Sequence, residues 1–272
     1  MEHEKILILG ASGFLGKAVI DECKRQKIPF TACNQTGKNG FTKVDITKKI
    51  LLKENYQIVI HLAAKNHAEK NPKLEYYEVN TLGTINVLNY CVQNNVKKLI
   101  FSSSCSVYGK ELEGLINEDY KCSKLSEYGK SKSLAEQAIR KYSKDYNLDY
   151  VIFRFPIIFG KNNDSLVSRI ISKYDENNLC FSGLFNFGIV YVKDAAKLIL
   201  EGISSGHGAY NSISITTNIE KIVKLLNEIN HQEKQFNFEG IPNKKLLFSS
   251  KKVNNEFDLV TSPLKDAIEK II

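Results

Sequence analysis

The stretch KILILGASGFLG, residues 5–16, decides the fold. An apolar run ends at Gly10 and apolar residues then recur at helical spacing over 14–25, so the stretch predicts strand, glycine turn and helix. Gly10 permits the tight turn, Gly13 lets the backbone approach a pyrophosphate, and Gly16 allows the helix to pack closely on the strand. The free N–H groups and the positive dipole end at the helix start favour a phosphate there. These features predict a dinucleotide-binding turn.

The residues that follow keep alternating between short apolar runs and helical patterns. This alternation predicts a parallel sheet covered by helices on both faces, which is an α/β, Rossmann-type, doubly wound fold. Ligands of such sheets bind at the carboxyl ends of the strands. The expected strands are 29–33, 41–45, 57–62, 98–103 and 150–155, and the expected helices are 47–55, 74–94 and 128–146.

The pattern loosens after residue 155. We expect residues 1–160 to form the dinucleotide-binding core and 161–272 to form mostly a smaller, interleaved substrate lobe, with 187–213 returning to the core. The elements expected here are helices at 166–174, 194–203, 219–229 and 264–272, strands at 187–192 and 209–213, and one short strand in the tail.

The composition is that of an ordinary globular protein, with 43% hydrophobic and 25% charged residues among 272. The net charge of +8 comes from scattered lysines, which predict a basic surface able to attract a diphosphate and not a nucleic-acid site. Six cysteines lack any Cys-x-x-Cys pair, so we expect neither disulfides nor a metal site. Without an apolar run typical of a signal peptide or membrane span, we expect a cytoplasmic protein with no membrane partner.

Tyr128 and Lys132 form a second motif. They are four residues apart, so they share one face of the predicted helix. A lysine beside a phenol favours the phenolate and is expected to lower the pKa of Tyr128. A tyrosine tuned in this way can give or take the proton of a sugar hydroxyl while hydride moves. A serine-rich strand end, FSSSCSVYG at 101–109, supplies a third hydroxyl.

The Gly-x-x-Gly-x-x-Gly turn, the serine-rich strand end and the Tyr-x-x-x-Lys pair together resemble the extended short-chain dehydrogenase/reductase family over nearly the whole chain. Its members act mostly on nucleotide sugars. The resemblance implies that Ser104, Tyr128 and Lys132 are catalytic and that Ser106 lies near the substrate. Arg154 is expected to contact substrate phosphate, with a structural ion pair as the alternative. The cofactor-binding residues that the turn and the resemblance imply are Gly10, Ser12, Gly13, Phe14, Leu15, Gly16, Asn34, Lys38, Asp45, Ile46, Leu62, Ala63, Ala64, Asn80, Tyr128 and Lys132.

One position departs from the family pattern. Relatives that prefer NAD have an acidic residue at the end of the second strand, where this chain has Asn34 and Gln35, with Lys38 close by. A neutral site does not repel a 2′-phosphate and a lysine pairs with one, so the cofactor is expected to be NADP or NAD with a lean to NADPH. The alternative is that Lys38 only occupies a mobile loop.

The residues beside Ser104 reduce the number of reactions that remain to be considered. Relatives that are 4,6-dehydratases carry Asp-Glu directly after the catalytic hydroxyl, where this chain has Cys105 and Ser106. Relatives that decarboxylate place a glutamate nearby, which is missing here. Relatives that epimerise at carbons 3 and 5 use a cysteine at position 106, so Cys105 is expected to be a buried thiol. The main expectation is reduction of a 4-keto nucleotide sugar with a proton from Tyr128. The alternatives are 4-epimerisation with retained NAD, and a dinucleotide-binding sensor or scaffold without turnover.

Three further expectations concern histidines, a carboxylate and assembly. His61 and His67 have no matched spacing and are expected to be non-catalytic, and Asp194 is expected to cap a helix. The resemblance implies a homodimer that pairs through the helices at 74–94 and 128–146.

Overall fold

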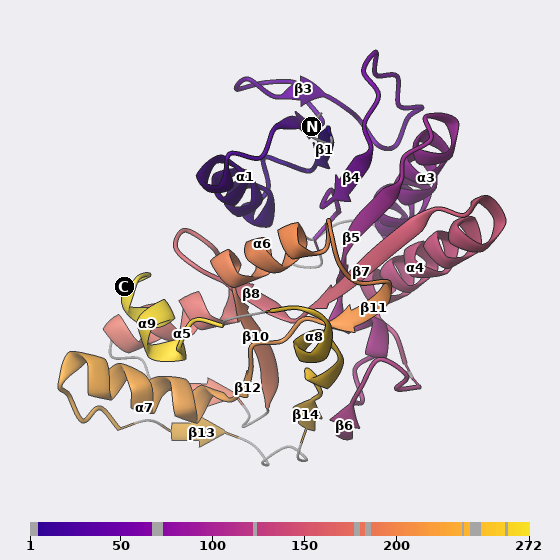
Figure 1. The fold of residues 1–272 in the computed structure, drawn as a ribbon. Helices are drawn as coiled ribbons and strands as arrows, with labels where there is room; N and C mark the ends of the chain where they lie inside the picture. The colour runs from indigo at the N-terminus through magenta and orange to yellow at the C-terminus, as the bar shows by residue number, and fades with distance from the viewer. Residues whose placement is uncertain are drawn as a thin grey trace.

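The structure is a computed structural model that describes residues 5–66, 73–121, 124–176, 180–182, 186–235, 237–239, 246–258 and 261–272. Seven strands form its main sheet in the order β11-β7-β5-β4-β1-β2-β3, and every pairing is parallel (Figure 1). This is the predicted Rossmann-type sheet. The strands are β1 (Ile6–Leu9), β2 (Phe30–Asn34), β3 (Thr42–Lys43), β4 (Ile58–His61), β5 (Lys98–Ser104), β7 (Asp149–Phe155) and β11 (Gly208–Asn211).

Helices cover both faces of this sheet (Figure 1). On one face, α1 (Phe14–Gln26) and α6 (Val192–Glu201) pack together, and Val19 and Ile199 join Ile8 in one apolar core. On the other face, α3 (Gly83–Gln93) and α4 (Glu127–Tyr146) pack over a second core. Strands β1 and β4 are buried along their whole length because both of their faces are covered. The doubly wound fold is therefore confirmed.

The remaining elements form a smaller lobe that is interleaved with the sheet. Strand β11 joins β7 in the main sheet, although β10 and β12, on either side of it in sequence, belong to a three-stranded sheet with β8. In the other direction, β6 precedes α4 in sequence but pairs with β14 near the C-terminus. The lobe contains β6 (Gly114–Ile116), β8 (Ile157–Phe159), α5 (Leu166–Asp175), β9 (Cys180–Ser182), β10 (Phe187–Tyr191), β12 (Ile215–Thr217), α7 (Ile219–Asn230), β13 (Asn237–Glu239), β14 (Leu246–Phe248), α8 (Lys251–Glu256) and α9 (Leu264–Glu269). Within the described residues, no helix is long and apolar enough to cross a membrane.

The predicted helix at 47–55 is wrong, because this segment consists of turns and extended chain. The carboxylate of Asp45 accepts hydrogen bonds from the backbone N–H (3.0 Å) and the hydroxyl (2.8 Å) of Thr47. These two hydrogen bonds close a turn where the first turn of the predicted helix would lie. Ile50 is buried, whereas its neighbour Leu51 is 80% exposed. The apolar residues therefore serve as separate anchors and not as one helical face.

The predicted single helix at 74–94 is interrupted. It consists of α2 (Lys73–Tyr76), the π-helical turn η1 (Tyr77–Leu82) and α3. A π-helical turn inserts an extra residue without changing the apolar character of the segment, so hydrophobic spacing does not reveal it. Such turns are frequent at functional sites, and this one carries Asn80.

Candidate active site

The glycine turn brings three pieces of backbone into contact. Gly10 has φ of +81°, and a Cβ there would lie 2.4 Å from the backbone nitrogen of Ala63. A Cβ on Gly16 would lie 2.4 Å from the carbonyl oxygen of Gly10. Gly13 is the N-cap of α1 and provides no side-chain cap, so the first N–H groups of the helix stay available. This open, positively polarised helix start fits the pyrophosphate of a dinucleotide.

The side chains of Ser12, Phe14 and Leu15 in this turn differ in how far they are exposed to solvent. The side chain of Ser12 is exposed beside the helix start, Phe14 is partly buried, and Leu15 is buried in the core with α1. A phosphate at this helix start would therefore meet backbone N–H groups and the Ser12 hydroxyl, while Leu15 fixes the helix against the sheet.

Asn34 ends β2 and organises the loop that follows. Its Oδ1 accepts hydrogen bonds from the backbone of Thr36 (3.1 Å) and Gly37 (2.6 Å), and its Nδ2 donates to the carbonyl of Lys38 (3.4 Å). The side chain of Lys38 is exposed. Neither Asn34 nor Gln35 supplies a carboxylate here, and the oxygen of Asn34 is already used within the loop.

Asp45 and Ile46 lie beside the opposite end of this loop and are tied to α3. The amide of Asn86 donates to the carbonyl of Ile46 (2.8 Å), and the Ile46 side chain fills the space beside Gly83. Burial alone would raise the pKa of the Asp45 carboxyl, but the hydrogen bonds from Thr47 and Gln35 outweigh it and lower that pKa. Asp45 is therefore an ionised acceptor at the expected adenine end of the site.

Asn80 joins the segment after β4 to helix α4. It is 1% exposed, and its Oδ1 accepts from the backbone N–H of Lys65 (2.8 Å). Its Nδ2 donates to the carbonyl of Lys65 (3.2 Å) and to the hydroxyl of Ser131 (3.0 Å). Leu62, Ala63 and Ala64 lie in this same segment, which passes directly over Gly10. Asn80 thus holds the expected cofactor-flanking segment in place through its hydrogen bonds to Lys65 and Ser131.

Ser104 is the last residue of β5 and the N-cap of the short 3₁₀ helix η2 (Cys105–Tyr108). Its Oγ accepts from the backbone N–H of Ser106 (3.1 Å) and donates to the Ser106 hydroxyl (3.2 Å). The two serines therefore present paired hydroxyls at the carboxyl end of β5, which is the edge where ligands of a parallel sheet bind.

Tyr128 lies in the first turn of α4 beside η2. Ser126 caps this helix by accepting from the N–H of Gly129 (3.0 Å), and a Cβ on Gly129 would lie 2.4 Å from the carbonyl oxygen of Ser106. This close approach brings the Tyr128 phenol into hydrogen-bond contact with the hydroxyl of Ser104. Burial raises the pKa of Tyr128 to about 12. The phenol is therefore protonated at neutral pH in this structure.

Lys132 is 3% exposed and lies one turn after Tyr128. Its Nζ donates to the carbonyl of Ser102 (2.8 Å) and lies 4.6 Å from the centre of the Phe101 ring. Burial lowers the pKa of Lys132 to about 7, although Glu136 acts in the opposite direction. The expectation that Lys132 lowers the pKa of Tyr128 is wrong for this structure, because the burial of the phenol dominates.

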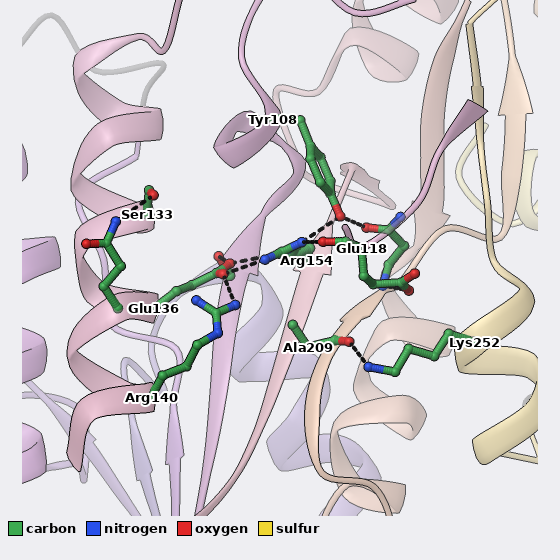
Figure 2. Close-up of polar contacts among 11 residues, drawn as sticks. Tyr108, Glu118, Ser133, Glu136, Arg140, Arg154, Ala209 and Lys252 are labelled. Atoms are coloured by element: carbon green, nitrogen blue, oxygen red, sulfur yellow. Dashed lines mark hydrogen bonds and ion pairs between the residues drawn. The ribbon is translucent and has the colours of Figure 1, made fainter. Parts of the chain in front are cut away.

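Arg154 does not face an open site. Its Nε and Nη2 donate to the two carboxylate oxygens of Glu136 (3.0 and 2.8 Å), and its Nη1 donates to the Tyr108 hydroxyl (2.7 Å) and the Glu118 carbonyl (2.8 Å) (Figure 2). The guanidinium is thus used in a buried ion pair, the alternative that the sequence left open, and this geometry does not support a phosphate contact. Sequence reasoning missed Glu136, although the spacing Tyr128-x₃-Lys132-x₃-Glu136 places it on the catalytic face of the helix.

Cys105, His61 and Asp194 have the contacts of residues that support the fold. The Cys105 thiol is buried, donates to the carbonyl of Arg154 (3.4 Å), and has its pKa raised by burial, so it is not a ready acid or base. His61 is fully buried against Thr84 (3.1 Å), and burial lowers its pKa to about 3. Asp194 does not cap a helix as predicted, because its carboxylate accepts from the backbone and hydroxyl of Ser262 (2.8 and 2.9 Å).

No group of three or more His, Cys, Asp or Glu residues that could hold a metal ion occurs within the part of the chain that the structure describes. His67 lies outside that part.

Two named relatives are similar to this chain in sequence over more than half of its length. A putative UDP-glucose 4-epimerase of Methanocaldococcus jannaschii is 28% identical over 263 residues, which cover 88% of this chain and 85% of that protein. A GDP-6-deoxy-D-talose 4-dehydrogenase of Aggregatibacter actinomycetemcomitans is 30% identical over 175 residues, which cover 62% of this chain and 59% of that protein.

The fold is also that of solved epimerases. The UDP-glucose 4-epimerase of Thermotoga maritima with UDP-glucose has a TM-score of 0.83 at 21% identity, and it covers 98% of this chain and 96% of its own. The UDP-glucuronic acid 4-epimerase of Bacillus cereus in complex with NAD has a TM-score of 0.84 at 23% identity, with 98% and 97% covered. The model of the NAD dependent epimerase/dehydratase family matches residues 6–211. The chain therefore belongs to the NAD dependent epimerase/dehydratase family, which confirms the resemblance to the extended short-chain dehydrogenases/reductases.

Proposed function

We propose that this protein is an NAD-dependent nucleotide-sugar 4-epimerase. The observation that carries the proposal is the contact between the Ser104 hydroxyl and the Tyr128 phenol at the carboxyl end of β5, with Lys132 buried one turn further along α4. Inversion at carbon 4 needs one acid-base group that takes a proton and returns it. The buried thiol of Cys105 supplies no second acid or base beside that pair.

Each residue has a defined task in this scheme. A bound dinucleotide would supply the hydride acceptor for carbon 4 and the hydride donor for the other face of the sugar. The start of α1 would hold its pyrophosphate, Asp45 and Ile46 would face its adenine, and Lys132 would bind its nicotinamide ribose. Tyr128 acts in this step as the phenolate, a form that the positive charges of a bound NAD⁺ and of Lys132 would favour over the protonated phenol of the structure; it takes the proton of the 4-hydroxyl and later gives it back. Ser104 donates a hydrogen bond to the same sugar oxygen and stabilises the charge that develops there.

The substrate class follows from the relatives and from the charge of this chain. The proteins compared above act on UDP- or GDP-sugars by name, and this chain carries a net charge of +8 that favours a diphosphate ligand. We assign the sugar to the interleaved lobe of residues 161–272, beside the paired hydroxyls of Ser104 and Ser106.

For the cofactor we favour NAD. The UDP-glucuronic acid 4-epimerase of Bacillus cereus is in complex with NAD, whereas the lean to NADPH rests only on the neutral Asn34 and the exposed Lys38. Binding of NAD⁺ and NADP⁺ to the purified protein, measured by calorimetry, tests this directly: the proposal predicts tighter binding of NAD⁺.

Turnover assays separate the candidate reactions. The purified protein is incubated with NAD⁺ and either UDP-glucose, UDP-galactose or a UDP-N-acetylhexosamine, and the anomeric signals are followed by proton NMR while NADH absorbance is recorded. Interconversion of the 4-epimers without net NADH supports the epimerase. Tyr128→Phe is the matched control, because it retains the ring and loses only the proton-transfer group.

Reduction of a 4-keto nucleotide sugar is the second candidate. It is favoured by the protonated state of Tyr128, which suits a proton donor, and by the similarity to a nucleotide-sugar 4-dehydrogenase. Consumption of NADH or NADPH in proportion to a 4-keto sugar, with no interconversion of 4-epimers, would establish this reaction in place of epimerisation.

We also propose that the protein is a homodimer that pairs through η1 and α4. These neighbouring elements carry the exposed side chains of Leu82 (57%), Leu134 (40%) and Tyr146 (57%). An apolar surface of this kind on a helix pair is typical of a protein interface.

A further inference from the structure

Glu136 continues the catalytic face of α4. It lies one helical turn after Lys132 and two turns after Tyr128, so the three side chains follow one stripe of the helix. The carboxylate is 2% exposed, and an unpaired buried charge would be costly. Burial alone would raise its pKa, but hydrogen bonds from Arg154 and Ser103 and the charges of Arg154 and Arg140 outweigh burial and lower it. Glu136 is therefore an ionised carboxylate inside the protein.

The partners of Glu136 lie on two neighbouring strands at one register. Its Oε1 accepts from the Ser103 hydroxyl of β5 (2.7 Å), and both of its oxygens accept from Arg154 of β7. Ser103 and Arg154 face each other in the parallel ladder. The next residue of β5 is Ser104. One carboxylate thus joins α4 to both strands, one residue before Ser104 in β5. Figure 2 shows its ion pair with Arg154.

Arg154 extends this connection to η2, to Glu118 after β6 and to β11 of the main sheet. Its Nη1 donates to the hydroxyl of Tyr108, the last residue of η2, and this hydroxyl donates to Asn211 of β11. The same Nη1 donates to the carbonyl of Glu118, whose carboxylate accepts from the N–H of Asn211 (2.8 Å). The η2 turn that carries Ser106 is therefore held by the same guanidinium that holds Glu136.

We propose that Glu136 and Arg154 are positioning residues, which hold Tyr128 and Lys132 of α4 in a fixed position relative to Ser104 and Ser106, so that Tyr128 and Ser104 meet one substrate oxygen while Lys132 reaches the nicotinamide ribose. Neither residue touches the substrate in this scheme. The inference rests on the proposed function, because it takes Ser104, Tyr128 and Lys132 to be the catalytic groups.

The charge of Glu136 also supplies a spectroscopic readout. The ionisable groups that interact electrostatically with Lys132 are Glu136 on α4 and His61 on β4, and Tyr128 lies one turn before it on the same helix. His61 is neutral at physiological pH, and Tyr128 is protonated. Glu136 is thus the charged neighbour that raises the pKa of Lys132, and a neutral residue in its place lowers that pKa further.

The test variant is Glu136→Gln, which retains the shape and removes the charge. We expect kcat for the nucleotide sugar to fall by about 10- to 100-fold, because a small misplacement of catalytic groups has effects of this size, while KM stays within about twofold. In protein labelled with [¹⁵N]lysine, the Nζ titration that disappears in Lys132→Met should move to lower pH. Glu220→Gln is the matched control, because it neutralises a surface carboxylate on α7 paired with Lys224.

Arg140→Ala distinguishes positioning from general support of the helix. Arg140 donates to Glu136 (2.8 Å), but its side chain is 40% exposed and it reaches neither strand. We expect this variant to retain kcat within about twofold, since the bonds from Ser103 and Arg154 remain. A loss equal to that of Glu136→Gln would overturn the proposal.

Three further results of these experiments also decide whether the proposal holds. A folded Glu136→Gln with unchanged kcat and an unshifted Lys132 titration overturns the proposal. If that variant fails to fold, Ser103→Ala and Tyr108→Phe each delete one uncharged group of the network, and wild-type kcat in both overturns it. If the wild-type protein turns over no nucleotide sugar, the proposed function fails, but the Lys132 titration still reports whether Glu136 acts on the catalytic lysine.

Discussion

At the scale of single residues, the active site combines two groups whose pKa values burial moves in opposite directions. Burial raises the pKa of Tyr128 to about 12 and lowers that of Lys132 to about 7. Both shifts favour the neutral form, because a buried charge loses its hydration. The protein therefore holds a protonated phenol beside an amine that gains or loses its charge near neutral pH.

Tyr128→Phe should reduce kcat by about 10²- to 10⁴-fold, which is the usual contribution of a positioned acid-base group. The affinity for NAD⁺ should change little, because the ring remains in its contact with Tyr76, 5.9 Å between ring centres. Steady-state kinetics and calorimetry measure the two quantities. Tyr142→Phe, which removes an exposed hydroxyl from the same helix, is the control. Retained turnover in Tyr128→Phe would exclude Tyr128 as the acid-base group.

The depressed pKa of Lys132 predicts a dependence of stability on pH. Between about pH 7 and the ordinary value of 10.5, the unfolded chain binds this proton and the folded protein does not. The free energy of unfolding therefore rises with pH in this window, by up to about 1.4 kcal/mol per pH unit, and the gain is lost as pH falls to 7. Relative to Lys132→Met, the wild-type protein should become more stable across the window in urea unfolding, whereas the exposed control Lys144→Met should show no such trend. A wild-type curve parallel to that of Lys132→Met would contradict the buried amine.

Asn34 tests the basis of cofactor choice. Asn34→Asp keeps the oxygen that accepts from Thr36 and Gly37 and adds a negative charge at the end of β2. A 2′-phosphate there is repelled, so affinity for NADP⁺ should fall by more than about tenfold relative to NAD⁺, or about 1.4 kcal/mol. Calorimetric titrations measure both. Gln35→Glu adds the same charge one residue away and should discriminate less; an equal effect would mean that Asn34 does not face the ribose.

At the scale of elements, the π-helical turn η1 fixes the cofactor-flanking segment through one amide. Asn80→Ala removes three hydrogen bonds and leaves the backbone of Lys65 and the Ser131 hydroxyl without this partner. We expect the free energy of unfolding to fall by about 2 to 3 kcal/mol, together with weaker NAD⁺ binding. Urea unfolding and calorimetry check both, with Asn89→Ala on the exposed side of α3 as control. A loss of stability with unchanged NAD⁺ affinity would separate Asn80 from the cofactor site.

The elements also show what the sequence determines. The apolar runs of β1, β4 and β5 and the glycines before α1 are local signals, so the main sheet and the dinucleotide turn were predictable. The turn at Asp45–Thr47 and the π-helical turn at Asn80 depend on side-chain hydrogen bonds, which hydrophobic spacing does not report.

The residues of the candidate site also differ in whether local sequence spacing predicts their contacts or whether those contacts depend on distant segments of the chain. Tyr128 and Lys132 share one helix, so their proximity follows from spacing alone. The environment of Arg154 could not be read in this way, because Glu136, Tyr108 and Glu118 reach it from three separate segments. The raised pKa of Tyr128 depends on burial by the folded chain, which local sequence does not contain.

At the scale of the whole molecule, the two lobes cannot be separated by one cut. Strand β11 of the later segment completes the main sheet, and β6 of the earlier segment pairs with β14. The carboxyl ends of β5 and β7 therefore meet the smaller lobe where the hydroxyls of Ser104 and Ser106 lie. The proposed function therefore places a sugar nucleotide bound by that lobe beside Ser104 and Tyr128.

The exposed apolar side chains on η1 and α4 predict assembly. Leu134→Lys introduces a charge on that surface and should convert a homodimer into monomers, because two lysines would be buried against each other across a two-fold axis. Sedimentation velocity measures the mass directly. Leu247→Lys, at an exposed position on β14, is the control. A wild-type protein that sediments as a monomer would contradict the proposed dimer.

The central claim is that one phenol and one bound dinucleotide invert carbon 4 of a nucleotide sugar. The most direct measurement uses UDP-glucose carrying deuterium at carbon 4, with the product analysed by NMR and mass spectrometry. The account predicts UDP-galactose that keeps the deuterium at carbon 4, because the same hydride returns to the opposite face. Deuterium lost to water, deuterium released on free NADH, or the absence of inversion would each contradict it.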